Sequence, residues 1–393
     1  MRQGTPLQRR EDRFLLLVLA SRHDPDLVRS LTGALRKPLD WRRVLRQADR
    51  HGVVPLLWAR LHEVPKESLP SGVAPHLRAA CAFILRHNLA LTAELVAILD
   101  GLAEAGIQAA PFKGPTLAMT AYGNIALRSF SDLDILIQLS DLHRAVSVLE
   151  SRGYEPAVRF DAQYLASECQ LRLISRQGHV AELHWQLLEK SFSCPLDIAG
   201  LWARMRKIEL AGRTVPTPGN EDLFLYLCLH GAKHHWDRLE WICSIAEIVR
   251  GPALDWTEIH VRSRRLGCVR AVCLGLLLAN RLLDAPIPRE FQQPLTGDRV
   301  IPALAAHVYR SLDEQPARTS AAERIFHHYF LIRCRERPID KWRVAIHSCA
   351  RTPHPESKEL VILPRALRFL YYVLRPLRLA GECAAFAWRW CLK

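Results

Sequence analysis

The sequence lacks two patterns that are typical of secreted and membrane-spanning proteins. No run of about 18 uninterrupted apolar residues occurs in the chain. Its opening, Met1 to Phe14, contains no apolar stretch that ends at a small-residue cleavage site. We therefore expect a cytoplasmic protein that has neither a secretion signal nor a membrane-spanning helix.

Paired cysteines are also missing. The chain has 11 cysteines, and no two of them stand in the Cys-x-x-Cys spacing that is typical of zinc sites and redox dithiols. Disulfide sets belong to oxidising compartments and usually follow an even count. We interpret these cysteines as buried thiols of a protein in a reducing compartment.

What the sequence does contain is typical of a globular protein with a basic surface. The 393 residues are 49% hydrophobic and 24% charged, which is enough for a large core divided among two or three units. The formal net charge of +14 favours anionic partners such as nucleotides, nucleic acid or lipid headgroups. An equally weighted alternative is that arginine is abundant throughout the chain and marks no particular partner.

The spacing of apolar residues divides the chain into three regions. Residues 1–75 are helical and end in a link rich in proline, serine and glycine, whereas the pattern after Pro195 is helical and broken by prolines. Between them, a long helix over 76–105 leads into short strands and helices. The fold class is therefore α/β (α+β): a small mixed β-sheet core at 76–190, flanked by helical regions at 1–75 and 191–393.

Within the core, the patterns predict a regular order of elements. We expect a helix, a strand, a helix turn, a strand, a helix and two strands around a glycine turn. In chain order after the long helix, these elements cover residues 107–112, 116–122, 132–138, 142–152, 171–175 and 180–185.

Two acids on one predicted strand form the most informative pattern. Side chains at i and i+2 of a strand project from one face, roughly 7 Å apart at the backbone, so Asp132 and Asp134 can share metal ions. Leu133, Ile135 and Ile137 then point into the core. Two divalent ions held by such carboxylates suit an in-line displacement at phosphorus. Without metal the two acids repel each other, so we expect Asp132→Ala or Asp134→Ala to leave the fold intact.

A third acid and a glycine turn strengthen this interpretation. Glu182 lies in the apolar segment Val180–Trp185, where an acid is costly unless it meets a cation, so we expect it to be partly protonated without metal. Lys113 and Gly114 follow a strand and precede a helix, where backbone amides can hold phosphate oxygens.

In their order and spacing, these strings resemble the uncharacterised nucleotidyltransferase family of the DNA polymerase β superfamily. The resemblance covers roughly residues 80–250 and extends to segments 227–230 and 239–241. It implies a short mixed sheet with helices on one side, and two magnesium ions bound by three acids. The strings that carry it are Phe112-Lys113-Gly114, Tyr122, Arg128, Ser131-Asp132-Leu133-Asp134 and Glu182-Leu183-His184-Trp185.

The resemblance also implies an activity and a set of site residues. The protein would move a nucleoside monophosphate from a nucleoside triphosphate such as ATP to a hydroxyl-bearing acceptor, and would release pyrophosphate. Asp132 and Asp134 would bind both magnesium ions, and Glu182 would bind one of them and act as the base. The nucleotide would be held by Lys113, Gly114, Arg128 and Ser131.

Several alternatives stay open at this point. The acceptor is a small molecule, a peptide, a nucleic-acid end or a lipid-linked intermediate. The rival to an enzyme is a catalytically silent module of the same fold that binds a nucleotide or a partner. Nucleic-acid binding is not favoured, because no dedicated nucleic-acid motif is visible. The sequence also departs from this family at one position, because family members often have an aspartate where this chain has Ser244.

Two further segments carry patterns of their own. His230, His234 and His235 lie on a predicted helix near Trp236 and Trp241, which favours a packing or substrate-binding helix over a zinc site because the Glu of His-Glu-x-x-His is absent. Residues 363–393 form a basic amphipathic helix. The favoured role of this helix is packing on its own protein, and the alternative is peripheral contact with an anionic membrane.

Overall fold

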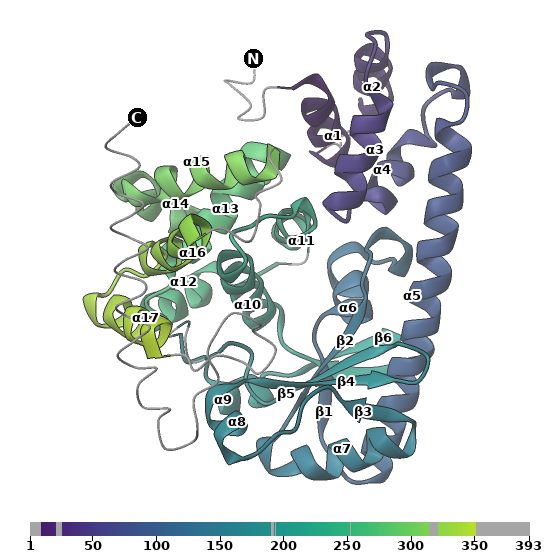
Figure 1. Ribbon diagram of the computed structural model, residues 1–393. Helices are drawn as coiled ribbons and strands as arrows, with labels where there is room; N and C mark the ends of the chain where they lie inside the picture. The colour runs from purple at the N-terminus through teal and green to yellow at the C-terminus, as the bar shows by residue number, and fades with distance from the viewer. Residues whose placement is uncertain are drawn as a thin grey trace.

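The computed structural model combines a helical half with a smaller half built on a mixed sheet (Figure 1). This confirms the fold class predicted from the sequence. The basic helix predicted at 363–393 lies outside the described residues, so its packing and membrane interpretations both remain predictions. The described residues are 9–20, 26–189, 192, 194–251, 253–313 and 321–350.

The sheet has five strands in the order β1-β2-β5-β4-β3. The central pair, β2 and β5, is parallel, whereas β1 pairs antiparallel with β2, and β4 pairs antiparallel with both β5 and β3. The sequence predicted four of these strands, and β3 is the additional one. The strand bounds are β1 Ala109–Pro111, β2 Asp132–Ile137, β3 Tyr154–Pro156, β4 Gln170–Ser175 and β5 Val180–His184.

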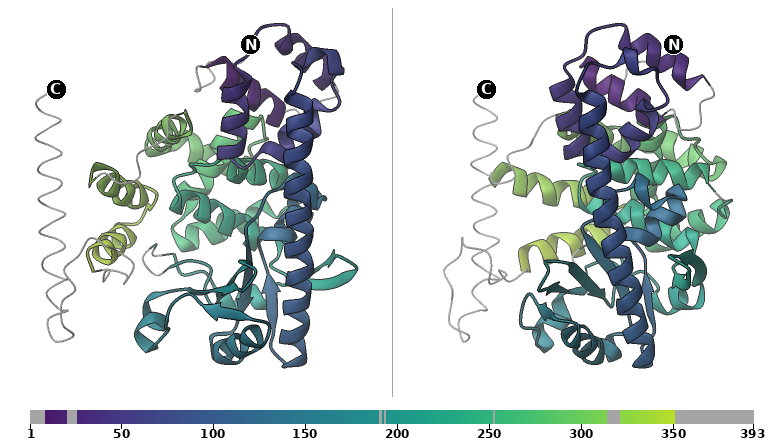
Figure 2. Two further views of the ribbon diagram at one scale, coloured as in Figure 1. Left: turned by 45° about the vertical axis from the view of Figure 1, so that its right-hand side comes forward. Right: turned by 90° about the vertical axis from the view of Figure 1, so that its right-hand side faces the viewer.

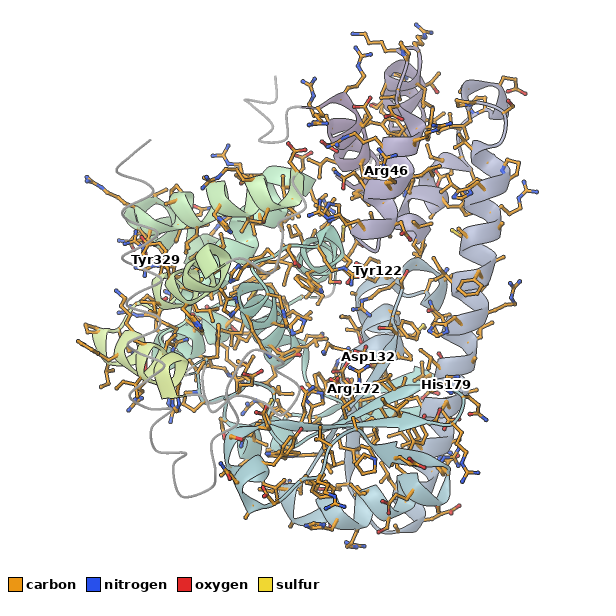
Figure 3. The ribbon with its side chains drawn as sticks, in the orientation of Figure 1. Arg46, Tyr122, Asp132, Arg172, His179 and Tyr329 are labelled. Carbon is orange, nitrogen blue, oxygen red and sulfur yellow. The ribbon has the colours of Figure 1, made fainter. Side chains whose placement is uncertain are left out.

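One face of the sheet is covered by helices α5 (Val73–Glu104) and α7 (Leu142–Ser151). Leu133, Ile135 and Ile137 of β2 are fully buried against these helices, as the alternation along the strand predicted. Asp132 and Asp134 therefore project from the other face. Figure 3 shows Asp132 and Arg172 on the side of the sheet that faces the helical half.

Short helical elements lie between and after the strands of the sheet. Between β1 and β2 the chain forms a helical turn, a π-helical turn and a 3-10 turn, where the sequence predicted one helix turn. The 3-10 turn η5 precedes α7. These connecting elements are α6 Gly114–Leu117, η3 Ala118–Tyr122, η4 Ile125–Leu127, η5 Leu139–Asp141, α8 Ala162–Ser167 and α9 Ile198–Ala203.

A hairpin corrects the expectation that the chain is helical after Pro195. Strands β6 (Arg206–Leu210) and β7 (Arg213–Thr217) pair antiparallel around Ala211 and Gly212. Both turn residues have positive φ, 51° and 78°, which is the conformation of a tight two-residue hairpin turn. The alternating polar and apolar residues on each side of Gly212 carried this signal, and the helical pattern around them hid it.

The helices before and after the sheet share one hydrophobic core. Phe14 of α1 and Leu57 of α4 belong to the same buried cluster as Leu274 of α13 and Trp236, which lies in the turn between α10 and α11. The two helical regions at 1–75 and 191–393 are thus packed together. The helices of this half are α1 Arg10–Ala20, α2 Leu27–Leu35, α3 Trp41–Arg50, α4 Val54–Leu61, α10 Asn220–Lys233, α11 Leu239–Arg250, α12 Trp256–Leu266, α13 Val269–Leu283, α14 Arg289–Gly297, α15 Val300–Asp313, α16 Ala321–Arg333 and α17 Pro338–Ala350, with the 3-10 turn η2 Lys66–Ser68.

The long helix α5 joins the two halves, and both views of Figure 2 show it running from the N-terminal helices to the sheet. Leu77 near its start lies in the helical core, and Leu95 further along lies in the core beneath the sheet. By length and composition α5 is apolar enough to cross a membrane, although the sequence analysis predicted no membrane-spanning helix. Here one of its faces packs on α4, α7, β1 and β2.

Candidate active site

The parallel pairing of β2 and β5 brings the predicted acids together. Asp134 lies directly opposite Glu182 in the register of the two strands, while Asp132 lies opposite Val180. Residues opposite each other project from the same face of a sheet, so Glu182 faces the same space as the aspartates. The sequence could place each acid on a strand, but only this non-local register makes them neighbours.

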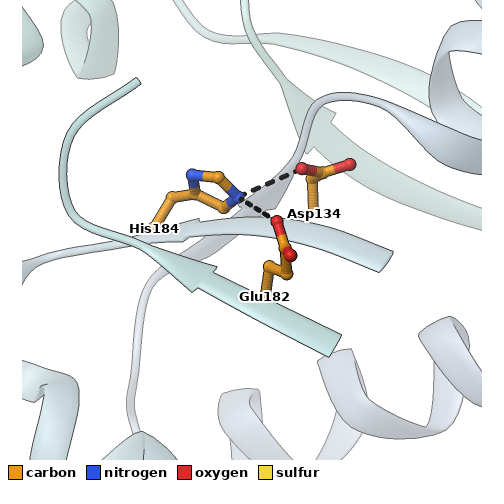
Figure 4. Close-up of side chains that lie close together, drawn as sticks. All are labelled: Asp134, Glu182 and His184. Atoms are coloured by element: carbon orange, nitrogen blue, oxygen red, sulfur yellow. Dashed lines mark hydrogen bonds and ion pairs between the residues drawn. The ribbon is translucent and has the colours of Figure 1, made fainter. Parts of the chain in front are cut away.

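His184 completes the cluster, and the sequence analysis gave it no role (Figure 4). Its Nε2 lies 3.1 Å from Asp134 Oδ1 and 3.6 Å from Glu182 Oε2. The ligand atoms of Asp134, Glu182 and His184 all lie within 4.8 Å of one another, which is close enough for one metal ion. The sequence does contain one signal for the role of His184: it stands two residues after Glu182 and therefore on the same face of the strand.

Asp132 lies beside this group without belonging to it. It is half-buried at the start of β2, whereas Asp134 is only 2% exposed. Burial and the negative charge of Asp134 raise the pKa of Asp132 above its ordinary value, although Lys113 opposes this. The structure therefore joins Asp134 and Glu182 directly and places Asp132 as their neighbour.

The acids differ in how their charge is stabilised. Burial raises the pKa of Asp134, but Lys113 and His184 outweigh it and hold that pKa below its ordinary value. Burial likewise raises the pKa of Glu182, but the neighbouring His184, 3.6 Å away, brings that pKa below its ordinary value. The expectation that Glu182 is partly protonated without metal is wrong, because His184 and Gln170, whose Nε2 donates to Glu182 Oε2 at 2.7 Å, supply the stabilisation expected from a cation.

Lys113 forms an ion pair with an acid instead of standing free at the glycine turn. Its Nζ lies 2.7 Å from Asp134 Oδ1. It also lies 5.7 Å from the ring centre of Phe112 and 5.8 Å from that of Tyr226. The side chain is thus a positive charge held between an acid and two aromatic faces.

Gly114 supports a close approach of two backbone segments. Its φ is +51°, which disfavours other residues, and a Cβ at this position would lie 3.2 Å from the carbonyl oxygen of Asp132. Phe112 also donates its backbone N–H to the carbonyl of Asp134 at 3.2 Å. The predicted phosphate turn therefore packs directly against the strand that carries the aspartates.

Arg128 is the second cation near the acids. It is 9% exposed, and its Nε and Nη1 have no hydrogen-bond partner among the residues that the structure describes. Its charge partly offsets the effect of burial on the pKa of Asp132 and of Glu240. Ser131 is exposed next to Asp132. Lys113, Gly114 and Ser131 thus lie next to the aspartates, and Arg128 acts on the charge of Asp132.

A buried pair of hydroxyl groups connects this site to the helical half. Tyr122 Oη lies 3.2 Å from Ser244 Oγ, which also donates to the carbonyl of Glu240 at 2.8 Å. On the other side, Asn88 Nδ2 donates to the carbonyl of Arg128 at 2.8 Å. Ser244 therefore helps to fix α11 against the segment that carries Arg128.

Comparison with solved structures found nucleotidyltransferases at low identity. Lincomycin-bound lincosamide antibiotic adenylyltransferase LnuA is 16% identical, over 34% of this chain and 82% of that one, with a TM-score of 0.25. The antibiotic-resistance factor ANT(2'')-Ia is 15% identical, over 50% and 91%, with a TM-score of 0.29. An antigenic nucleotidyltransferase-like protein from Paracoccidioides brasiliensis is 15% identical, over 53% and 97%, with a TM-score of 0.30.

Comparison with protein families gives a broader match, whereas no curated protein matched this chain. Residues 37–284 fit the family described as uncharacterised nucleotidyltransferase. The matched segment is more than half of the chain, and it contains the sheet, the acids and helices α10 and α11. The chain therefore belongs to the uncharacterised nucleotidyltransferase family.

Proposed function

We propose that this protein transfers a nucleoside monophosphate from a nucleoside triphosphate to a hydroxyl-bearing acceptor and releases pyrophosphate, using two magnesium ions. The observation that supports this most is the register that sets Asp134 opposite Glu182, with Asp132 on the same face and with Lys113 and Arg128 nearby. Such a reaction needs carboxylates that bind metal ions and positively charged side chains that bind phosphates.

The residues present fit magnesium. Asp132, Asp134 and Glu182 would hold it, because carboxylate oxygens are the ligands that magnesium prefers. Asp134 Oδ2 is buried and accepts no hydrogen bond within the described part of the chain, so it has a free position for a cation. When bound, the ions would supply charge neutralisation of the triphosphate and activation of the acceptor hydroxyl.

The other steps of the proposed reaction, phosphate binding and proton transfer, would be carried out by side chains of this protein. Lys113 and Arg128 would attract the phosphates, and the Gly114 turn would hold them close to β2. The acceptor oxygen would form a new bond to the α-phosphorus as the bond to the pyrophosphate oxygen breaks. The hydroxyl proton would pass to the carboxylate of Glu182, which Gln170 and His184 hold in place.

Labelled nucleotides test the proposed reaction directly. The protein is incubated with magnesium, acceptor extracts and a nucleoside triphosphate labelled at either the α- or the γ-phosphate. We expect label from the α-phosphate to appear on the acceptor and label from the γ-phosphate to appear in pyrophosphate. Transfer of the γ-label would instead indicate a kinase, and no transfer of either label would contradict the proposal.

A specific observation favours a second candidate, the catalytically silent module. Lys113 already neutralises Asp134 at 2.7 Å, so the acids are partly satisfied without metal. A nucleotide could then bind through the cations alone. In the proposed enzyme, by contrast, Lys113 must leave Asp134 when metal and nucleotide bind.

Replacement of Lys113 separates these two candidates. We expect Lys113→Met to bind manganese at least about tenfold more tightly without nucleotide, because a competing charge beside Asp134 is removed. Calorimetry would measure this affinity. Lys233→Met is the matched control, since Lys233 pairs with Glu189 at 2.8 Å instead of with the acid cluster. Unchanged or weaker manganese binding by Lys113→Met would favour the silent module.

A further inference from the structure

A group of aromatic rings near the acids has no assigned role: His230 lies on α10, His234 caps the end of that helix, and Trp241 lies on α11. His230 and His234 have ring centres 4.7 Å apart, and Trp241 lies 5.5 Å from His230 and 5.4 Å from His234. We call His230, His234 and Trp241 the ring cluster. The planes of its rings meet at 56°, 82° and 44°, so the rings are not stacked face to face on one another.

A continuous line of contacts connects the ring cluster to the acids. Lys113, which pairs with Asp134, lies 5.8 Å from the ring centre of Tyr226. Tyr226 Oη in turn lies 3.3 Å from His230 Nδ1. The ring cluster is thus reached from the acids through Lys113 and Tyr226, on the side of the site where the phosphates are proposed to bind.

Burial decreases along this line. Tyr226 is buried at 2% exposure, His230 and Trp241 are half-buried, and His234 is exposed. Ring faces that only pack the core would be covered on both sides. These rings instead open to solvent beside the site, which leaves surface for a flat ligand.

The histidines of the ring cluster are neutral near pH 7. Burial, followed by the charge of Lys113, lowers the pKa of His230 well below its ordinary value. Packing of its ring against neighbouring side chains and the charge of Lys233 lower the pKa of His234 below its ordinary value, although the residue as a whole is exposed. They are not arranged as metal ligands, because among the described residues the group that could share an ion is Asp134, Glu182 and His184.

We infer that the ring cluster is the surface on which the nucleobase of the nucleoside triphosphate stacks. This inference rests on the proposed function. With the phosphates held by Lys113 and Arg128, the base extends away from the acids by the length of the ribose, and the ring cluster is the aromatic surface next to that position. Stacking accepts every base because each has a flat π face, so binding through the ring cluster discriminates weakly among bases.

Comparison of ATP with inorganic tripolyphosphate tests this inference, since only ATP carries a base. Calorimetry with magnesium should show that Trp241→Ala and His234→Ala each weaken ATP binding about tenfold, in line with base stacking on aromatic residues. Tripolyphosphate affinity should stay within about twofold of the wild type, because its contacts to Lys113 and Arg128 are kept. Trp241→Phe, which retains a ring, should restore most of the ATP affinity.

The control is Trp342→Ala on α17, where the side chain is 68% exposed and outside the site. Equal weakening of both ligands, or no change for either, would overturn the inference. So would a wild-type protein that binds tripolyphosphate as tightly as ATP. A wild-type protein that binds neither ligand would contradict the proposed function itself, and with it the inference.

Discussion

Asp134→Ala should abolish nucleotidyl transfer and also lower the free energy of unfolding, by about 3 kcal/mol or more. Asp134 is 2% exposed and holds two cationic or hydrogen-bonding partners, Lys113 at 2.7 Å and His184 at 3.1 Å. Its removal leaves the charge of Lys113 buried without a counterion. The sequence-based expectation that the fold tolerates this change is revised, because the sequence did not show these two partners.

Asp132→Ala is the matched comparison. Burial and Asp134 raise the pKa of Asp132, so its charge is unfavourable in the metal-free protein. Its removal should therefore abolish transfer with little loss of stability, or with a small gain. Urea unfolding of both variants, beside the α-label assay, would measure the difference. Equal stability of the two variants would contradict the buried ion pair, and near-normal transfer by either would remove that aspartate from the site.

Glu182→Gln should keep nucleotide binding and slow transfer at least about a hundredfold, the usual effect of losing a general base. The amide has the shape of the carboxylate and can keep a contact with Gln170, but it cannot take the acceptor proton. The nucleotide would still be held by Lys113, Arg128 and the Gly114 turn. Calorimetry of nucleotide binding and a single-turnover transfer assay would measure the two effects separately.

The control for this variant is Glu155→Gln on β3. Glu155 is an exposed acid opposite Ile174, away from the aspartates, so its loss should change neither binding nor transfer. Full-rate transfer by Glu182→Gln would exclude Glu182 as the base. A loss of nucleotide affinity as large as the loss of rate would instead make it a binding residue.

The sequence predicted the parts of the site that depend on neighbouring residues. Alternation along residues 132–138 placed Asp132 and Asp134 on one face and Leu133, Ile135 and Ile137 on the other, and the structure has this arrangement. The turn at Gly114 was also predicted, because a glycine directly after a strand is a local signal for a turn, and the structure gives this glycine a positive φ.

The parts that the sequence did not predict depend on distant residues. The pairing of Asp134 with Glu182 joins strands that are separated by α7, β3 and β4, and no local pattern sets that register. The contact of His184 with Asp134 follows from this register, whereas the ion pair of Lys113 follows from the pairing of β1 with β2. The shared core of the N-terminal and C-terminal helices, as of Phe14 with Leu274, is another long-range result that periodicity cannot show.

Anomalous scattering from crystals grown with manganese and a non-hydrolysable nucleoside triphosphate would test the central claim most directly. We predict manganese bound by Asp132, Asp134 and Glu182, with Lys113 moved from Asp134 to the phosphates. Manganese found elsewhere, or a nucleotide bound with Lys113 still paired to Asp134 and no metal on these acids, would contradict it.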